Sequence, residues 1–380
     1  MPVNIVEGLM SIWMESGLMG LSWKNLVMFA IGSLLIYLGI KYEMEPLLLV
    51  PIGLGAILTN IPNTGIAAQG EIGNVLYLFE HYLIRPEIVP TLIFLGVGAM
   101  TDFGPLLSDP KTFLLGAAAQ VGIFATLIGA LALGFSAAEA ASIGIIGGAD
   151  GPTTIYTTST LAPHILGATS VAAYSYMAMV PLIIPPVVKL LTTKKERQIK
   201  MKQTGNVSKR VKMIFPVVAF IVAGLLVPKS IPLIGMVMVG NLFKESGVTD
   251  RLAKGASEEL MNIVTIILGL TVGSTMTGSS FIRVETLMIL VLGVAAFAVA
   301  VGSGVLLAKL MNLISSEKIN PMIGAAGCSA VPMAARVVQD LGKKEDPHNN
   351  LLMHAMGPNV AGVLGSATAA GILITLVQGL

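Results

Sequence analysis

The sequence predicts an all-α polytopic membrane protein, and its composition and two interrupted apolar segments support this. Apolar residues make up 54% of the chain, charged residues 12%, and the mean hydropathy is +0.83. Such values are typical of a chain that lies mostly within a bilayer, rather than of a soluble domain with one anchor. The 380 residues leave room for about nine to eleven transmembrane helices of about 20 residues. Glycine and proline interrupt the segments 141–163 and 319–339, where we expect broken or re-entrant helices.

The elements expected in chain order divide the protein into four parts. Residues 1–25 include two glutamates and have no continuous apolar core, so they predict an interfacial helix rather than a cleavable signal peptide. The first membrane half, 26–188, has apolar spans at about 26–40, 47–59, 88–101, 112–135, 141–163 and 165–191. A basic loop, 189–212, follows. The second membrane half, 213–380, has spans at about 213–227, 231–243, 260–277, 284–314, 319–339 and 350–378.

The basic loop sets the expected orientation of the chain. Its charged side chains are Lys189, Lys194, Lys195, Arg197, Lys200, Lys202, Lys209, Arg210 and Lys212, with Glu196 as the only acid. Cytoplasmic loops of membrane proteins carry such an excess, so the loop is expected in the cytoplasm. It is either a topology signal alone or a docking surface for a soluble partner. The net charge of +2 gives no reason to expect nucleic acid, and a single cysteine excludes a disulfide framework.

The two membrane halves resemble each other in an internal repeat. A shift of 177 residues places Leu115-Gly116-x-Ala118-Ala119 on Leu292-Gly293-x-Ala295-Ala296. The same shift places Gly147-x-Ala149 on Gly324-x-Ala326, and Met179-x-Pro181 on Met356-x-Pro358. Broken helices at matched positions of two halves are the usual sequence sign of a transport site at the middle of the membrane. We therefore expect an inverted repeat, with chance self-matching of small residues as the alternative.

Gly147-Gly-Ala-Asp150-Gly-Pro-Thr153 is the most informative stretch. An ionised aspartate at membrane depth is costly, so it normally faces a cavity or a partner. Glycine and proline prevent a regular helix there and free backbone carbonyls. A carboxylate beside carbonyl and threonine oxygens has the ligand chemistry of a hard-cation site.

The second broken segment supplies further polar groups. It begins at Asn320-Pro321 and continues through Gly324 and Ser329 to Arg336, and a third break carries Asn359. Arg336 is interpreted as a buried charge that meets Asp150 at the membrane midplane, or alternatively as a side chain that reaches the surface. An alternative interpretation of Asn320 is a helix cap before Pro321.

These two motifs resemble those of the beta subunits of the sodium-pumping biotin-dependent decarboxylases, a family that acts on oxaloacetate, methylmalonyl-CoA or glutaconyl-CoA. The resemblance covers nearly the whole chain. It implies a membrane subunit in the bacterial inner membrane that decarboxylates carboxybiotin, consumes a proton and exports sodium. The implied partners are a biotin carrier subunit, a carboxyltransferase (alpha) subunit, a small membrane-anchor subunit, the lipid bilayer and further copies of the same chain. The compact length of the chain favours an acyl-CoA decarboxylase.

The resemblance also implies roles for individual residues. Asp150, Tyr176, Ser329 and Arg336 are the expected catalytic residues, and Arg336 is also expected to hold carboxybiotin with paired donors. Asp150, Asn320, Gly324, Ser329 and Asn359 are the expected sodium ligands, because sodium takes oxygen ligands as other hard cations do. Tyr176 has packing as its alternative role. The competing function is a sodium-coupled secondary transporter of a carboxylate solute, which the repeat and the broken helices alone do not exclude.

Overall fold

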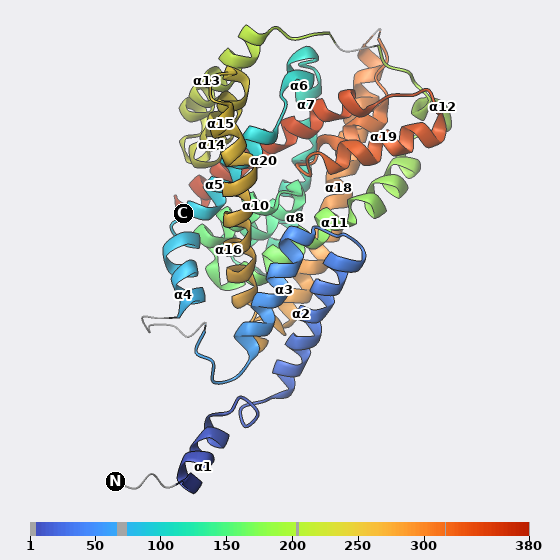
Figure 1. The fold of residues 1–380 in the computed structure, drawn as a ribbon. Coiled ribbons are helices and arrows are strands. Elements are labelled where there is room, and N and C mark those ends of the chain that lie inside the picture. The colour runs from blue at the N-terminus through green and yellow to red at the C-terminus, as the bar shows by residue number, and fades with distance from the viewer. Residues whose placement is uncertain (1–4, 67–73, 203–204, 316, 380) are drawn as a thin grey trace.

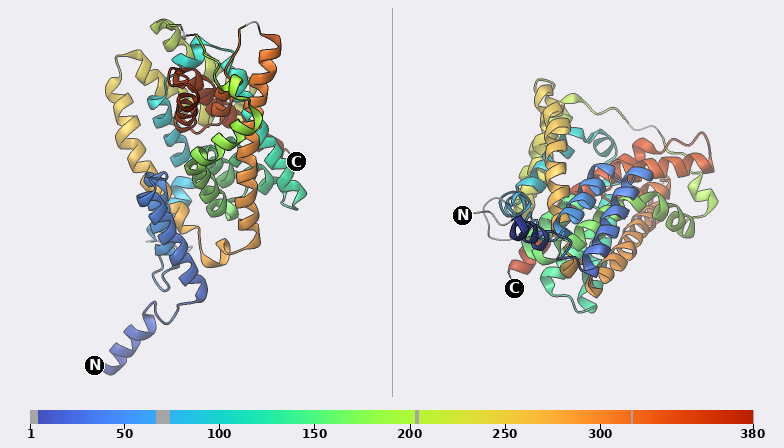
Figure 2. Two further views of the ribbon diagram at one scale, coloured as in Figure 1. Left: turned by 90° about the vertical axis from the view of Figure 1, so that its right-hand side faces the viewer. Right: turned by 60° about the horizontal axis from the view of Figure 1, so that its bottom comes forward.

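The fold is helical throughout the part of the chain that is described, as the composition predicts. This computed structural model describes residues 5–66, 74–202, 205–315 and 317–379, and every regular element in those ranges is a helix. The helices form one elongated body, from which α1 (Ile5–Glu15) projects at one end (Figures 1 and 2).

Five helical stretches of the described chain are long and apolar enough to cross a membrane. They are Trp23–Lys41, Thr112–Ala132, Asp250–Ser274, Val284–Ile314 and Leu352–Gln378. Two bent pairs, Val75–Ile84 with Ile88–Met100 and Pro163–Tyr176 with Met179–Leu191, raise the number to seven if each pair is one span. The nine to eleven expected spans also included segments such as Pro46–Asn60 and Ala137–Gly148, which are apolar helices of fewer than 18 residues.

Equivalent elements follow one another in the same order in the two halves. The first half contains α2 (Trp23–Lys41), α3 (Pro46–Asn60), α4 (Val75–Phe79), η1 (Glu80–Ile84), α5 (Ile88–Met100), α6 (Gly104–Ser108), α7 (Thr112–Ala119), α8 (Val121–Ala132), α9 (Ala137–Ile145), η2 (Ile146–Gly148), α10 (Gly151–Leu161), η3 (Pro163–Ile165) and α11 (Leu166–Leu191). The second contains α13 (Lys209–Leu226), η4 (Pro228–Ser230), α14 (Ile231–Ser246), α15 (Asp250–Gly255), η5 (Ala256–Leu260), α16 (Met261–Ser274), α17 (Gly278–Phe281), α18 (Val284–Ile314), η6 (Pro321–Gly327), α19 (Met333–Glu345) and α20 (Leu352–Gln378). The π-helical turns η1 and η5 begin 176 residues apart, close to the repeat seen in the sequence.

Backbone approaches at glycine recur at equivalent places in the two halves. A Cβ added to Gly147 would lie 2.4 Å from the carbonyl oxygen of Gly122, and one added to Gly324 would lie 2.1 Å from that of Gly304. Both distances are too short for any side chain, so each broken segment packs directly against a spanning helix. Gly147 and Gly324 are the pair that the 177-residue shift superposes.

The repeat is inverted, because equivalent helices run in opposite directions. Ser303 of α18 donates to the carbonyl of Ala118 in α7 at 2.8 Å, whereas Gly129 of α8 lies against Leu292. The stretch α7–α8 therefore runs antiparallel to α18, its counterpart in the second half.

One sequence match falls outside the register that the structure shows. The helices α11 and α20 begin 186 residues apart, at Leu166 and Leu352. In the 177-residue register, Pro181 and Pro358 therefore do not occupy equivalent positions in these two helices. The ungapped register fits the first two matches only, because the second half is longer before its last helix.

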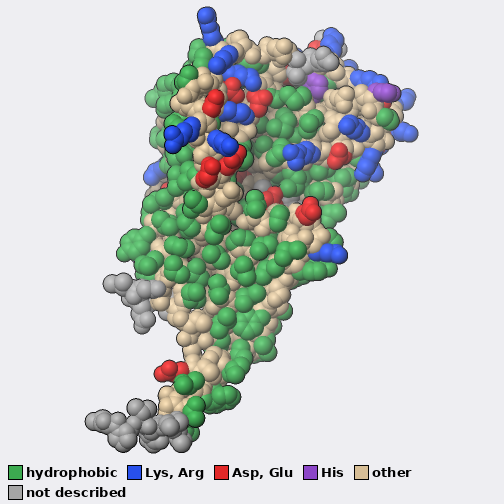
Figure 3. Space-filling model, viewed as in Figure 1, with side chains coloured by type: hydrophobic (Ala, Val, Ile, Leu, Met, Phe, Trp, Pro, Cys, Tyr) green, Lys and Arg blue, Asp and Glu red, His purple; other side chains and the backbone are tan. Residues whose placement is uncertain are grey.

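Charged side chains gather at one end of the molecule and the opposite part is mainly apolar (Figure 3). The charged end includes α12 (Lys194–Arg197), within the basic loop, and the start of α13. Exposed leucine, isoleucine and valine side chains on α2, α13 and α18 cover the apolar part. A surface of this kind fits a bilayer around the body, with the basic loop at one membrane face.

Candidate sodium and decarboxylation site

The two broken segments cross, and they bond to each other at their breaks. The backbone N–H of Ser329, which follows η6, donates to the carbonyl of Gly148, at the end of η2, at 2.9 Å. Each break frees backbone groups from helical bonding, and here the groups of one break satisfy those of the other. The two broken segments therefore meet at this point, and Asp150 follows it directly.

Asp150 begins the second half-helix of the first broken segment. It is the N-cap of α10, and its Oδ1 accepts from the backbone N–H of Thr153 at 3.0 Å. The side chain is buried, at 5% exposure. The amino end of a helix carries partial positive charge and stabilises a carboxylate there. The helix end therefore supplies partial positive charge and a hydrogen bond to a carboxyl group that is otherwise enclosed.

The second oxygen of Asp150 is bound by Ser366, which the sequence analysis did not single out. The hydroxyl of Ser366, on α20, donates to Oδ2 of Asp150 at 2.6 Å. The hydroxyl of Ser329 donates in turn to that of Ser366 at 2.9 Å. A chain of two serines thus joins the second broken segment to the carboxylate of the first. Such a chain can pass a proton, or exchange a donor hydrogen bond for a cation.

Asn359 lies on α20 two turns before Ser366, so the two side chains share a face of the helix. Its amide nitrogen donates to the carbonyl of Cys328 at 2.6 Å. Its amide oxygen is fully buried and has no hydrogen-bond partner within the described structure. A buried acceptor without a donor is costly unless it meets water or a cation. The seven-residue spacing from Asn359 is the sequence signal that could have identified Ser366.

The structure separates the two tyrosines of α11. Tyr174 packs its ring against Gly151, where an added Cβ would lie 2.3 Å from the ring, so it is next to Asp150. Its hydroxyl is buried without a partner in the described residues. Tyr176, the expected catalytic residue, instead packs against Gly293 of α18 and donates to the carbonyl of Leu290. Tyr174 is therefore the tyrosine adjacent to the carboxylate in this conformation.

Asn320 lies in the second broken segment but away from Asp150. Asn320 caps η6, its side-chain oxygen accepting from Met322 N at 3.0 Å, as the alternative interpretation expected. The preceding residue, Ile319, bonds to Asn312 near the end of α18. Asn312 is twelve residues from Ala300 along α18, which is about 18 Å. Ala300 lies at the level of Gly147 in the first broken segment, because both contact Gly122. Gly324 serves the close contact with Gly304 described above.

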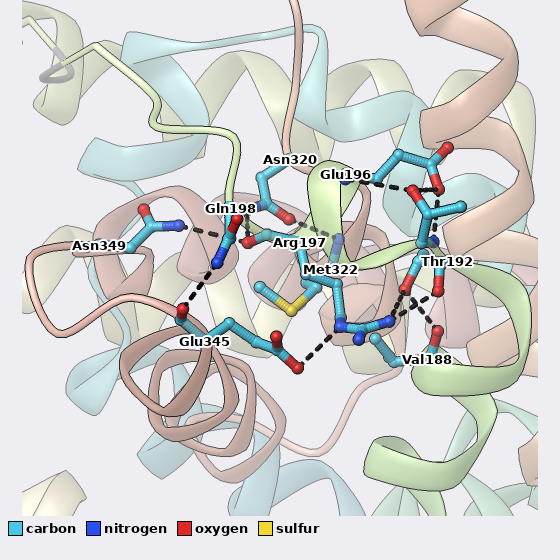
Figure 4. A network of polar contacts seen from close by, with 10 residues as sticks. Val188, Thr192, Glu196, Arg197, Gln198, Asn320, Met322, Glu345 and Asn349 are labelled. Carbon is cyan, nitrogen blue, oxygen red and sulfur yellow. Dashed lines mark hydrogen bonds and ion pairs between the residues drawn. The ribbon is translucent and has the colours of Figure 1, made fainter.

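Asn320 fastens the basic loop to the second half (Figure 4). Its side-chain nitrogen donates to the carbonyls of Arg197 and Ile199 at 2.8 and 2.9 Å. Asn349 donates to the same two carbonyls at 3.4 and 3.2 Å. The guanidinium of Arg197 pairs with Glu345 at 2.8 Å, and both side chains are only 12% exposed. We call these residues, Arg197, Ile199, Asn320, Glu345 and Asn349, the loop clamp.

The charge on the neighbouring Glu196 is also stabilised. Partial burial would raise the pKa of its carboxyl group, but hydrogen bonds from Thr193 and from the Lys309 ammonium outweigh this and hold the pKa below its ordinary value. Lys309 belongs to α18, so the loop is bound to a spanning helix as well.

Arg336 is exposed, which corrects the expectation of a buried charge opposite Asp150. It lies in the first turn of α19, and its guanidinium makes no hydrogen bond or ion pair in the described part of the chain. The amphipathic α19 directs its apolar face into the core, with Ala335 and Val338 buried. The side chain of Arg336 therefore extends from the other face, as the alternative interpretation expected.

A cavity of about 520 Å³ opens beside the loop clamp. Among the side chains lining it are Lys111, Lys200, Lys202 and Lys318, with Asp109, Glu317 and His354. His354 is on α20 and lies twelve residues, or about 18 Å along the helix, before Ser366. The excess of ammonium groups makes the cavity attractive to a small anion, and α20 leads from it to Asp150.

Comparison with known proteins assigns the family. A family described as the Na⁺-transporting oxaloacetate decarboxylase beta subunit matches residues 24–377. The chain belongs to this family. It is 53% identical to the methylmalonyl-CoA decarboxylase subunit beta of Propionigenium modestum, over 98% of this chain and 100% of that protein. It is 54% identical to the glutaconyl-CoA decarboxylase subunit beta of Acidaminococcus fermentans, over 98% and 99%. It is 48% identical to the probable oxaloacetate decarboxylase beta chain of Vibrio cholerae, over 98% and 100%.

The protein is thus the multi-pass membrane subunit of a sodium-transporting decarboxylase. As a beta subunit it is one component of a complex of several subunits. Membership of this family decides between the two functions left open by the sequence, because the alternative was a transporter without catalysis.

Proposed function

We propose that the chain decarboxylates carboxybiotin presented by a separate carrier subunit, and that Asp150 binds the sodium ion that is exported. The observation that carries the proposal is the hydrogen-bonded chain from Ser329 through Ser366 to Asp150, at the crossing of the two broken segments. In the reaction the N–C bond of carboxybiotin breaks, carbon dioxide leaves, and the ring nitrogen takes up a proton.

The proposed sodium site uses oxygens on three elements. Asp150 supplies the charge, Ser366 and Ser329 supply hydroxyls, and the unpartnered amide oxygen of Asn359 completes the set. This donor set suits a hard cation. Arrival of sodium would displace the hydrogen bond from Ser366 to Asp150, and its departure would let a proton take its place. Asp150 and Ser329 thereby couple ion release to proton movement.

The carboxylated carrier is expected at the charged end of the molecule. The lysine-lined cavity attracts an anion, and the exposed Arg336 can grip a carboxylate with two parallel hydrogen bonds. The basic loop is the proposed docking surface for the soluble carrier and the carboxyltransferase subunit. A small membrane-anchor subunit and further copies of this chain complete the proposed complex.

We propose that the complex decarboxylates an acyl-CoA. Alignments to the two acyl-CoA decarboxylase subunits span 397 and 374 residues at 53% and 54% identity, whereas the Vibrio cholerae protein needs 433 residues at 48%. The extra length reflects insertions that this chain lacks. Turnover of the purified complex with glutaconyl-CoA, methylmalonyl-CoA and oxaloacetate tests this, and activity with oxaloacetate alone would contradict it.

The sodium site is tested by Asp150→Asn in the complex reconstituted into lipid vesicles. An amide keeps the shape but removes the charge that binds the cation, so sodium-dependent carbon dioxide release and ²²Na⁺ uptake are expected to fall by at least about 100-fold. Asp340→Asn is the matched control, because Asp340 is exposed on α19. Near-normal sodium-stimulated turnover in Asp150→Asn would rule out the proposed role.

A further inference from the structure

A polar stripe runs along α10, starting from Asp150. Thr153, Thr157 and Thr160 follow Asp150 at intervals of three, four and three residues, which places all four side chains on one face of a helix. From Asp150 to Thr160 the stripe is about 15 Å long. It contrasts with the side of α10 that carries Ile155, which belongs to the apolar core.

Two hydroxyls of this stripe are buried without partners. Thr153 and Thr157 are fully buried, and neither hydroxyl makes a hydrogen bond in the described structure. Most threonines in apolar helices donate to the carbonyl four residues earlier, as Thr154 and Thr271 do here. Consecutive unsatisfied hydroxyls on one helix face are costly in a dry core, so they indicate a row of sites for water or a cation.

The stripe ends on a carboxylate, that of Glu87. The hydroxyl of Thr160 donates to Oε1 of Glu87, which precedes α5 and is half-buried. The adjacent turn at Pro163 and His164 lines a cavity of about 510 Å³. Helix α11 leads from this turn to the basic loop over 26 residues, which is about 39 Å of helix in two parts bent by 61°. The stripe therefore runs from Asp150 away from the loop.

We propose that Thr153, Thr157, Thr160 and Glu87 line the route by which sodium leaves Asp150 for the face opposite the basic loop. The ligands on this route are hydroxyl and carboxylate oxygens, which suit a partly dehydrated hard cation. The dipole of α10 assists, because its positive end is at Asp150 and its negative end is toward Glu87. The inference rests on the proposed role of Asp150 and adds the direction and the residues of release.

The test uses Thr157→Val in the reconstituted complex, because valine keeps the shape and removes only the hydroxyl. ²²Na⁺ transport and sodium-stimulated turnover at saturating sodium are expected to fall about tenfold, the effect of losing one good polar contact. The sodium concentration for half-activation is expected to stay within about twofold, because loading at Asp150 is unchanged. Thr157→Ser restores the hydroxyl and is expected to restore transport.

Thr271→Val is the matched control. Thr271 is equally buried on α16, but its hydroxyl is satisfied by the carbonyl of Ile267 at 2.7 Å. If Thr157 instead lies in a dry core that no ion crosses, Thr157→Val will leave transport unchanged. The unfolding temperature will then be the same or higher, because an unpartnered buried hydroxyl has been removed. That result would overturn the route. The proposed function of Asp150 would still stand if the wild type transports sodium and Asp150→Asn does not.

A second measurement does not depend on transport. Thr157→Cys is expected to react with a small cationic thiol reagent added at the face opposite the basic loop, and sodium is expected to slow the reaction. The measurement uses a Cys328→Ser background, so that position 157 carries the single cysteine. Lack of reaction at position 157 under conditions that label an exposed cysteine would also overturn the route.

Discussion

Asp150 owes its chemistry to three neighbours that come from different parts of the chain. The helix end of α10 stabilises its negative charge, while Ser366 and, through it, Ser329 connect it to the second half of the molecule. The helix end and Ser366 favour the ionised carboxylate through donated hydrogen bonds, and Ser329 donates to Ser366. Sodium must replace some of these bonds, so its affinity depends on hydroxyls as well as on the charge.

Removing the hydroxyl of Ser366 should therefore affect sodium directly. Ser366→Ala is expected to change the sodium concentration for half-activation about tenfold, because a ligand and the donor to Asp150 are lost together. Turnover against sodium concentration measures this. Ser142→Ala is the control, since Ser142 is also fully buried but bonds only to the carbonyl of Ala138. Equal sodium curves for the two variants would show that Ser366 is not a ligand.

Arg336 should act on the carboxylated substrate rather than on sodium. Its guanidinium is exposed, and lysine cannot reproduce its paired donors. Arg336→Lys is expected to raise the carrier concentration needed for half-maximal turnover about tenfold, while half-activation by sodium stays the same. Carrier titrations at fixed sodium measure the first quantity. A shift in the sodium curve with unchanged carrier kinetics would place Arg336 at the ion site instead.

Among the elements, the broken segments are held by contacts between bare backbones. Gly304 of α18 meets the carbonyl of Gly324, and a Cβ on Gly304 would lie 2.0 Å from that oxygen. The packing leaves no flexible side chain to move aside. The position of η6 along α18 therefore depends on glycine at both places.

Gly304→Ala is accordingly expected to displace η6 and to lower sodium-dependent turnover of the complex by more than about tenfold. Gly235→Ala is the control, because Gly235 is inside α14 and its nearest neighbour is Ile231 Cγ2 at 3.6 Å. In a helix interior alanine is also more favourable than glycine by about 1 kcal/mol, so Gly235→Ala is not expected to destabilise α14. Turnover per folded complex distinguishes the two variants, and a Gly304→Ala protein as active as the control would contradict the packing argument.

The loop clamp gives Asn320 a role in positioning. Both ends of its amide bind protein backbone, and Asn349 duplicates its contacts to the loop. Asn320→Ala is expected to weaken carrier docking, raising the carrier requirement about tenfold with half-activation by sodium unchanged. Asn349→Ala should show a smaller change of the same kind, because its hydrogen bonds are longer. A changed sodium requirement in Asn320→Ala would instead support the ligand role expected from the sequence.

For the whole molecule, orientation in the membrane follows from the basic loop. A cysteine at Ser208, just before α13, is expected to resist an impermeant thiol reagent added outside intact cells and to react in opened cells. The test uses a Cys328→Ser background, so that position 208 carries the single cysteine. Rapid labelling from outside would place the loop on the outer face and reverse the proposed direction of transport.

The sequence was sufficient for features that depend on residue type and spacing. The apolar spans, the breaks around Asp150 and Ser329, and the inverted repeat follow from glycine, proline and periodicity. It was insufficient where side chains of one residue type differ only in their surroundings. Nothing local distinguishes Tyr174 from Tyr176, or marks Ser366 among the small residues of α20, because their roles arise from the helices they meet. The buried position expected for Arg336 was wrong because α19 has one buried and one exposed face, and Arg336 is on the exposed face.

The inverted halves have a consequence for the conformational cycle. Two equivalent scaffolds in opposite orientations can each adopt the conformation now held by the other. Exchanging those conformations would turn the molecule, to a first approximation, into an upside-down copy of itself. The alternative state can therefore be constructed by building residues 26–188 in the conformation of residues 213–380, and residues 213–380 in the conformation of residues 26–188. Distances measured between spin labels on paired helices during turnover would then alternate between two values that the present structure already contains.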